Sequence, residues 1–213
     1  MNLILFGPHG AGKGTQAQFI VNKFNYFQLS TGDLLRKEIK DKTPMGQEIE
    51  DIISKGDFAT DDIVNTLLKK VITNNLYKNK IIFDGYPRNI KQAENLEDIL
   101  KEANQKIGII IFLNVSKEII EKRIIGRITC EKCNITLNEF FNKTEINNHR
   151  CGQEFLKKRK DDNPKTIITR YDAYMEKTKP VLNFYSKKTI LYEINGSLKI
   201  EDISSKIEHI LKV

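Results

Sequence analysis

Short runs of apolar residues recur along this chain, and longer stretches with apolar residues three or four positions apart lie between them. The runs have the length of strands, and the spaced pattern is typical of amphipathic helices. We predict strands at residues 3–6, 81–83, 109–115 and 190–194, with a weaker one at 26–29. Because the runs are apolar throughout and alternate with helices, they predict an α/β fold, a five-stranded parallel sheet flanked by helices.

Two stretches depart from this alternation. Residues 31–64 predict two or three short helices, which is too much for a simple crossover between strands. Residues 127–160 lose the pattern and hold all three cysteines. We call the first stretch the flap and the second the lid. Both are predicted to be inserted in a core made of residues 1–30, 65–126 and 161–213.

Composition narrows the class of protein only a little. A chain of 213 residues with 39% apolar and 30% charged residues is typical of one globular domain with a real core. No stretch has the length of a membrane span, and the N-terminus lacks the pattern of a secretory signal, so we expect a cytoplasmic protein that does not bind membranes. The net charge of +7 fits polyanionic partners without distinguishing nucleotides from nucleic acid.

The clearest chemical signal is the sequence GPHGAGKGTQ at residues 7–16, which follows a predicted strand and precedes a helical pattern. Strand, glycine-rich turn and helix in this order are typical of a phosphate-binding loop, where backbone N–H groups and the helix dipole attract anionic oxygens. Lys13 supplies a mobile charge for the outer phosphates, and Thr15 a hydroxyl for them or for Mg²⁺. The alternative is a glycine turn without function.

Polar residues just after other strands are candidates because ligands bind at the carboxyl ends of parallel strands. Asp84 ends one strand, where a carboxylate commonly orients the magnesium of a nucleotide; its alternative is a simple turn residue. Arg88 follows and would direct its guanidinium at phosphate. Arg123 and Arg127, four residues apart, are predicted to share a helical face, although such pairs are commonly exposed to solvent.

Four motifs, in order and with fitting spacing, resemble those of the adenylate kinase family of nucleoside monophosphate kinases. They are GPHGAGKGTQ at residues 7–16, STGDLLR at 30–36, DGYPR at 84–88 and RKDDN at 159–163. The likeness covers essentially the whole chain, and a glycine after the loop lysine is a habit of this family. It implies a phosphate-loop kinase that transfers the terminal phosphoryl group of ATP, with Mg²⁺, to AMP and forms two ADP.

The resemblance also implies the site residues. ATP would be bound by Gly10, Ala11, Gly12, Lys13, Gly14, Thr15, Arg123, Arg127, Thr136, Leu137 and Leu198. AMP would be bound by Thr31, Arg36, Asp57, Phe58, Ala59, Gly85, Tyr86, Pro87, Arg88, Gln92, Arg159 and Arg170. The catalytic cations would be Lys13, Arg88, Arg123, Arg159 and Arg170, and the carboxylates that orient magnesium or arginines would be Asp84, Asp161 and Asp162. No general base is needed, because the attacking oxygen of AMP is already ionised. Closure of flap and lid would exclude water.

The cysteines bear on a structural metal. Cys130 and Cys133 form a C-x₂-C pair, which favours a metal or redox site over a disulfide in a chain without an export signal. Some members of the family hold zinc in the lid with two such pairs. Here Cys151 matches the last cysteine, but the position three before it is Asn148. His149 would complete a Cys₃His site, with Glu154 as a weaker candidate; a metal-free lid is the alternative.

Other readings stay open at this point. A kinase of the same family could take UMP or CMP as acceptor, because base choice depends on Gln92 and on backbone contacts. A zinc-ribbon protein that binds nucleic acid would explain the net charge and the C-x₂-C pair, but it leaves the arginines without a role. We expect a monomer whose partners are ATP, AMP and ADP, and not nucleic acid. His9 and His209 are predicted to be surface residues.

Overall fold

The structure, a computed structural model, describes residues 1–54, 59–133, 135–158 and 164–212. The chain divides into two compact units. Unit 1 consists of Met1–Phe6, Ala17–Phe112 and Lys177–Tyr192. Unit 2 consists of Gly7–Gln16, Leu113–Glu176 and Glu193–Val213.

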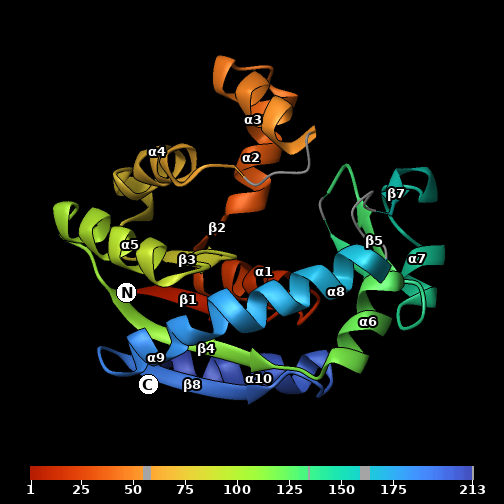
Figure 1. The fold of residues 1–213 in the computed structure, drawn as a ribbon. Helices are drawn as coiled ribbons and strands as arrows, with labels where there is room; N and C mark the ends of the chain where they lie inside the picture. Colours follow the sequence, from red (N-terminus) through yellow and green to blue (C-terminus); the bar gives the residue numbers. More distant parts are fainter. Residues whose placement is uncertain (55–58, 134, 159–163, 213) are drawn as a thin grey trace. The chain divides into compact units, whose positions relative to one another are not determined.

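A five-stranded parallel sheet flanked by helices is the main feature of the fold, as predicted (Figure 1). Its strands, in the order β2-β3-β1-β4-β8, are β2 (Phe27–Ser30), β3 (Ile81–Asp84), β1 (Asn2–Phe6), β4 (Ile107–Asn114) and β8 (Ile190–Asn195). In the centre, Leu3 of β1 is in register with Ile82 of β3 and with Ile109 of β4. Every residue of β1 is buried, because neighbouring strands and helices cover it on all sides.

The two ends of the sheet order explain why some predicted strands were weaker in the sequence. β8 lies at one edge, and only Ile194 of its residues is fully buried, while Ile190 is 58% exposed. β2 lies at the other edge, where only Leu29 is fully buried. An edge strand needs fewer apolar residues, so its signal in the sequence is fainter.

Helices follow the strands where the apolar spacing predicted them. They are α1 (Lys13–Phe24), α2 (Thr31–Lys40), α3 (Pro44–Ser54), α4 (Asp61–Ile72), α5 (Ile90–Glu102), α6 (Lys117–Ile125), α8 (Pro164–Ala173), α9 (Lys179–Ser186) and α10 (Ile200–Lys212), with the short turn η1 (Asn75–Tyr77). Polar side chains cap three of them: the side chains of Ser30, Thr60 and Asn89 accept hydrogen bonds from backbone N–H groups in the first turns of α2, α4 and α5.

The helices of the flap have a small apolar core of their own. Ile49 of α3 is fully buried and clusters with Ile63 and Leu67 of α4, and residues of α2 pack around them. α4 continues to Ile72, beyond residue 64, so a single helix connects the flap region to the chain before β3.

Pro180 interrupts the long C-terminal helical stretch, as predicted. The residues Tyr174–Thr178 form a π-helical turn, η3, between α8 and α9, and Pro180 lies in the first turn of α9. Proline lacks a backbone N–H and its ring meets the carbonyl one turn earlier, so a wider turn before it relieves the conflict.

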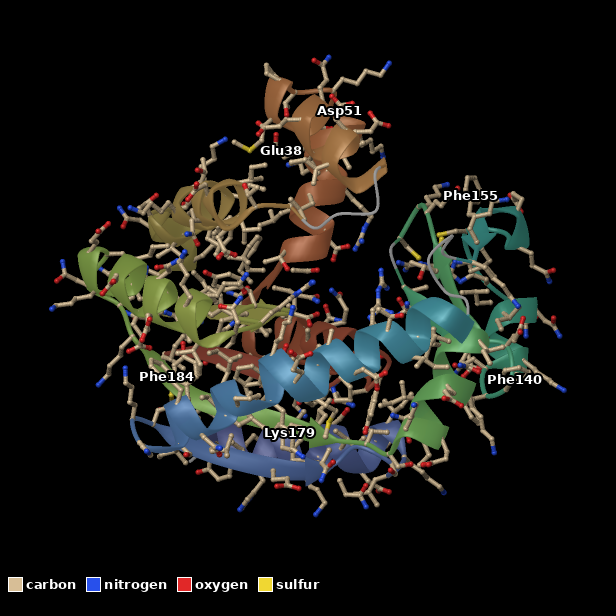
Figure 2. All side chains as sticks on the ribbon, viewed as in Figure 1. Glu38, Asp51, Phe140, Phe155, Lys179 and Phe184 are labelled. Carbon is tan, nitrogen blue, oxygen red and sulfur yellow. The ribbon has the colours of Figure 1, made fainter. Side chains whose placement is uncertain are left out.

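The lid contains a second, smaller sheet within unit 2. Its antiparallel strands, in the order β6-β5-β7, are β6 (Thr136–Asn138), β5 (Arg127–Cys130) and β7 (Leu156–Lys157), accompanied by α7 (Lys143–Asn147) and the turn η2 (Gln153–Phe155). Phe140, labelled in Figure 2, packs its ring against Gly126, where a Cβ atom would lie 2.5 Å from the ring. This close approach joins the end of α6 to the turn after β6.

Candidate active site and metal centre

The loop between β1 and α1 is folded into an anion-binding shape in the absence of any ligand. Gly10 and Gly12 have φ angles of +84° and +96°, which favour glycine. The Ala11 N–H donates to the Pro8 carbonyl over 3.1 Å. A Cβ atom at Gly10 would lie only 2.7 Å from the Ile124 side chain, so α6 packs directly on the loop backbone. The loop therefore leads into the N-terminus of α1 at a shape that packing holds in place.

Lys13, the first residue of α1, curls back over this loop. Its Nζ donates to the carbonyl oxygens of Gly7 over 2.8 Å and of Pro8 over 3.0 Å. The ammonium group is half-buried, and the two oxygens replace part of its water shell. A phosphate oxygen at the loop could exchange for these partners without a large movement of the side chain.

Gln16 anchors the same helix to the C-terminal part of unit 2, a role that the sequence analysis missed. Its side chain is 2% exposed, its Nε2 donates to the Ile200 carbonyl over 3.2 Å, and its Oε1 accepts from the Ser204 hydroxyl over 2.9 Å. The contact ties α1 to α10, just after the loop that holds Leu198. A buried glutamine on an otherwise apolar helix face was the signal available in the sequence.

Arg123 and Arg127 both reach the phosphate loop, but not from one helical face as predicted. Gly126 ends α6, so Arg127 is the first residue of β5 and only Arg123 is helical. The Arg123 Nη1 donates to the Ala11 carbonyl over 3.3 Å, and burial lowers the pKa of its guanidinium. The Arg127 Nη2 donates to the Nε2 of His9 over 2.7 Å.

His9 is the second residue that the sequence analysis misjudged. It was expected on the surface, but it is half-buried, and its Nε2 lies 2.7 Å from the Arg127 Nη2 and 3.4 Å from the Arg170 Nη1. Three cations from α6, β5 and α8, namely Arg123, Arg127 and Arg170, thus contact residues of the loop within unit 2. The partners of His9 lie 118 and 161 residues away in the chain, so no local pattern pointed to it.

A second group of predicted residues gathers in unit 1, where β3 ends. The Thr31 hydroxyl donates to the Gly85 carbonyl over 3.3 Å, and the Arg88 Nε donates to the same carbonyl over 2.8 Å. Gly85 has a φ of +78°, and the Tyr86–Pro87 peptide bond is cis. The predicted residues of the DGYPR motif and Thr31 therefore form one contact group.

Gln92 is held in one orientation within this group. Its Oε1 accepts from the Arg88 N–H over 2.8 Å, and its Nε2 donates to Asp61 Oδ1 over 2.7 Å, so the donor and the carboxylate decide which way the amide points. The buried Tyr86 donates its hydroxyl to Asn65 and also contacts the Gln92 carbonyl. Burial, then the nearby Asp61 charge, raises the pKa of the Tyr86 hydroxyl.

Arg36 and Asp84, also in unit 1, have partners of their own. The Arg36 Nη2 contacts Asp33 Oδ1 one turn earlier on α2, and the side chain stays largely exposed. The Asp84 carboxylate accepts from the Gln28 Nε2 over 2.9 Å across β2 and β3. An exposed ion pair of this kind is weak, so it leaves Arg36 able to exchange Asp33 for a phosphate.

A small apolar gap adjoins Thr31. It has an empty volume of about 140 Å³ and is lined by Thr31, Leu34, Leu35, Val64 and Leu67 from α2 and α4. Apolar walls beside one hydroxyl suit a flat, mostly apolar ring. The four apolar residues were not predicted as site residues, because they follow the ordinary spacing of a helix core.

The remaining predicted residues are less informative. Ala59 packs on the apolar core of the flap, Thr136 is exposed on β6, Leu137 is buried in the small sheet, and the Leu198 N–H contacts the Asn195 carbonyl. Five predicted site residues lie outside the described residues: Asp57, Phe58, Arg159, Asp161 and Asp162.

The lid brings the predicted metal ligands together. One ligand atom from each of Cys130, Cys133, His149 and Cys151 lies within 4.8 Å of all the others. The Cys133 Sγ is 3.7 Å from the His149 Nε2, close to the ~3.5 Å that tetrahedral zinc with ordinary Zn–S and Zn–N bonds would set between them. Neither Asn148 nor Glu154 belongs to the cluster, so the geometry favours His149 as the fourth ligand.

The thiols of this cluster have unequal acidity. Burial raises the pKa of the Cys130 thiol, but hydrogen bonds with Cys133, His149 and Lys132 lower it more, and the resulting pKa is about 6. Burial, followed by contacts with Cys133 and Cys130, raises the pKa of the Cys151 thiol. The thiolate is the form that binds a metal ion, so the cluster already favours one such ligand. A Cys₃His set of this size is compatible with zinc.

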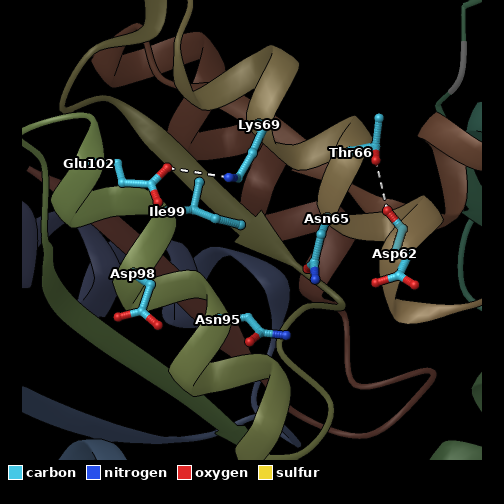
Figure 3. A pocket seen from close by; sticks show the side chains of 8 residues that line it. All are labelled: Asp62, Asn65, Thr66, Lys69, Asn95, Asp98, Ile99 and Glu102. Carbon is cyan, nitrogen blue, oxygen red and sulfur yellow. Dashed lines mark hydrogen bonds and ion pairs between the residues drawn. The ribbon is translucent and has the colours of Figure 1, made fainter.

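A polar groove of about 360 Å³ lies between α4 and α5 in unit 1 (Figure 3). It is lined by Asp62, Asn65, Thr66, Lys69, Asn95, Asp98, Ile99 and Glu102, and Lys69 forms an ion pair of 3.3 Å with Glu102. None of its lining residues was predicted as a site residue. Only Asn65, through Tyr86, touches the group around Gln92.

Among the helices of the described residues, none is both long and apolar enough to cross a membrane.

Comparison with known proteins gives a consistent result over the whole chain. A family model described as "Adenylate kinase" matches residues 5–190. The chain is 64% identical over 213 residues to an adenylate kinase of Pelagibacter ubique (strain HTCC1062), covering 100% of both chains. It is 37% identical over 213 residues to an adenylate kinase of Limosilactobacillus reuteri subsp. reuteri (strain JCM 1112), covering 99% of this chain and 98% of the relative. It is 38% identical over 213 residues to one of Novosphingobium aromaticivorans, covering 99% of each.

Proposed function

The chain belongs to the adenylate kinase family, and we propose from this premise that it reversibly transfers the terminal phosphoryl group of ATP to AMP, which forms two ADP. The observation that carries the proposal is a preformed anion loop in unit 2 with four cations in contact with it. These cations are Lys13, Arg123, Arg127 and Arg170. A site of this kind serves a reaction whose main difficulty is accumulated negative charge.

On the ATP side, we propose that the loop backbone from Gly10 to Thr15 and the Lys13 ammonium group bind the phosphates, while Arg123 and Arg127 bind them from the opposite side. The loop N–H groups and the N-terminus of α1 need no rearrangement for this, because glycine geometry and packing already hold them. Thr136, Leu137 and Leu198 are proposed to contact the nucleotide more weakly.

On the AMP side, we propose that Arg36 and Arg88 bind the monophosphate and that Thr31 and Gln92 meet the base at the apolar gap. The oriented amide of Gln92 offers a base a fixed donor and a fixed acceptor, which is the kind of contact that distinguishes one base from another. Gly85, Tyr86 and Pro87 form the wall beside Arg88. Asp57, Phe58, Ala59, Arg159 and Arg170 complete the proposed set.

The chemistry follows from charge alone. The attacking oxygen of AMP is already ionised, so no side chain has to remove a proton. The proposed cations lower the barrier by neutralising charge that spreads over the transferring group, and each fixed donor of this kind contributes about 10²–10³ in rate. We propose that Thr15 and Asp84 serve Mg²⁺, because a hydroxyl and a carboxylate are oxygen ligands that this ion accepts. When bound, Mg²⁺ neutralises charge on the outer phosphates.

We also propose that residues 31–64 and 127–160 act as a flap and a lid on the core of residues 1–30, 65–126 and 161–213, and that closing them excludes water as a competing acceptor. The lid is proposed to hold one structural Zn²⁺ on Cys130, Cys133, His149 and Cys151, which supports its small sheet. The active form is proposed to be a cytoplasmic monomer.

A panel of acceptors tests the proposed function. Purified protein is given ATP, Mg²⁺ and either AMP, UMP, CMP or GMP, and diphosphate formation is followed. We expect AMP to be preferred by a wide margin. Preference for UMP or CMP would change the acceptor while keeping the class, and diphosphate formation from none of them would overturn the proposal.

A further inference from the structure

His9 occupies an unexpected place in the phosphate loop. Its Nε2 lies 2.7 Å from the Nη2 of Arg127 on β5 and 3.4 Å from the Nη1 of Arg170 on α8, all within unit 2. A guanidinium group has only donors, so the Nε2 has to accept. The imidazole is therefore neutral, with its proton on Nδ1.

This contact differs in kind from the others around the loop. Lys13 and Arg123 donate to backbone carbonyls of the loop, which any residue type would offer. Arg127 and Arg170 instead meet at a side chain, and one lone pair stands between two like charges. Such charge-assisted hydrogen bonds are among the stronger ones, and two guanidinium groups repel each other without an acceptor between them.

Nucleotide binding does not have to break this arrangement. Each guanidinium group has five N–H donors in a planar fork, and the contact with His9 involves one of them. Phosphate oxygens can approach other donors of the same fork. Orienting a long arginine side chain before the ligand arrives removes an entropic cost from binding, which is the general benefit of a pre-arranged site.

We propose that His9 is a positioning residue for the reaction: its Nε2 orients Arg127 and Arg170 at the phosphate loop before ATP binds. The inference rests on the proposed function, because it assigns these arginines to the phosphates. It also concerns a residue to which the adenylate kinase resemblance gave no role.

Three substitutions at this position separate acceptor geometry from size. In His9→Gln the amide oxygen can reach the place of Nε2, whereas in His9→Asn it can reach only the place of Nδ1. His9→Leu keeps bulk and offers no acceptor. We expect His9→Leu and His9→Asn to raise the KM for ATP about tenfold and to leave the KM for AMP within about twofold. His9→Gln should restore most of the affinity, and His209→Leu on the exposed face of α10 should behave like the unaltered protein.

The outcomes are separable. If the unaltered protein forms ADP and His9→Leu has an unchanged KM for ATP, the inference is wrong and the proposed function stands. If His9→Gln is as impaired as His9→Leu, the acceptor role is wrong. Thermal melting of each variant shows whether it folds.

A spectroscopic measurement needs no activity. In ¹⁵N NMR of the nucleotide-free protein, we expect His9 to give the signature of a neutral ring protonated at Nδ1. A ring protonated at Nε2, or a fully protonated ring at neutral pH, would contradict the proposed contact whatever the enzyme does. Absence of ADP formation with the expected tautomer would instead refute the proposed function alone.

Discussion

The phosphate loop and the cysteine cluster of the lid both lie in unit 2, and they reach their chemistry by different routes. The loop is one continuous stretch whose shape comes from glycine backbone angles and from the packing of Ile124 on Gly10. The cluster draws four side chains from residues 130–151 and places three thiols and an imidazole in contact. Polar groups held this close need a metal ion or a proton between them to be stable.

The difference teaches which property each region should control. The loop keeps its shape through local packing, so changing its charges should lower the rate and leave stability alone. The cluster depends on its ion for the fold of the lid, so losing the ion should lower stability first. The predictions that follow test this division, beginning with the largest expected effect.

Lys13→Ala should lower kcat by about 10²–10³, because the group that meets the outer phosphates is lost. The melting temperature should stay close to that of the unaltered protein, since the lost contacts are two hydrogen bonds of a half-buried side chain to loop carbonyls. Steady-state assay and thermal melting measure both. Lys206→Ala, on the exposed side of α10, is the matched control and should change neither quantity.

His149→Ala should lower the zinc content well below one ion per chain and lower the melting temperature by several degrees, since the lid loses a ligand and its cross-link. Glu154→Gln should keep about one zinc ion and the original melting temperature, because Glu154 is not part of the cluster. Metal analysis and calorimetry distinguish them. Equal zinc in both variants would show that His149 is not a ligand.

Gly10→Ala should destabilise the protein by about 1–3 kcal/mol, because the added methyl group meets Ile124 and the backbone angle disfavours any residue but glycine. Gly14→Ala should not destabilise it, since Gly14 lies in α1 and a Cβ there meets no atom within 4 Å. Chemical denaturation measures both changes. Similar losses at the two positions would contradict the account of how the loop is held.

The sheet and the loop could be predicted because their signals are local. Strands such as β1 and β4 are buried on both sides and appear as apolar runs, and the glycine pattern stands directly after one of them. The Cys₃His cluster was also predictable, since cysteines in a C-x₂-C pair have few other uses in such a chain. Pro180 marked the break between α8 and α9 for a similarly local reason.

The errors share another cause. Arg127 was placed on a helix from its spacing to Arg123, although Gly126 between them ends that helix. His9 was dismissed because its partners, Arg127 and Arg170, are distant in the chain, and only folding brings them together. Gln16 was missed because a buried amide looks in sequence like any polar residue on a helix. The division into core, flap and lid stays a prediction.

The central claim is that this chain exchanges phosphoryl groups between adenine nucleotides, and the reverse reaction tests it most directly. The protein is mixed with ADP and Mg²⁺ alone, and ³¹P NMR follows the resonances. We predict that ADP is converted into ATP and AMP in equal amounts until an equilibrium is reached. ADP that stays unchanged, or that yields only inorganic phosphate and AMP, would contradict the account.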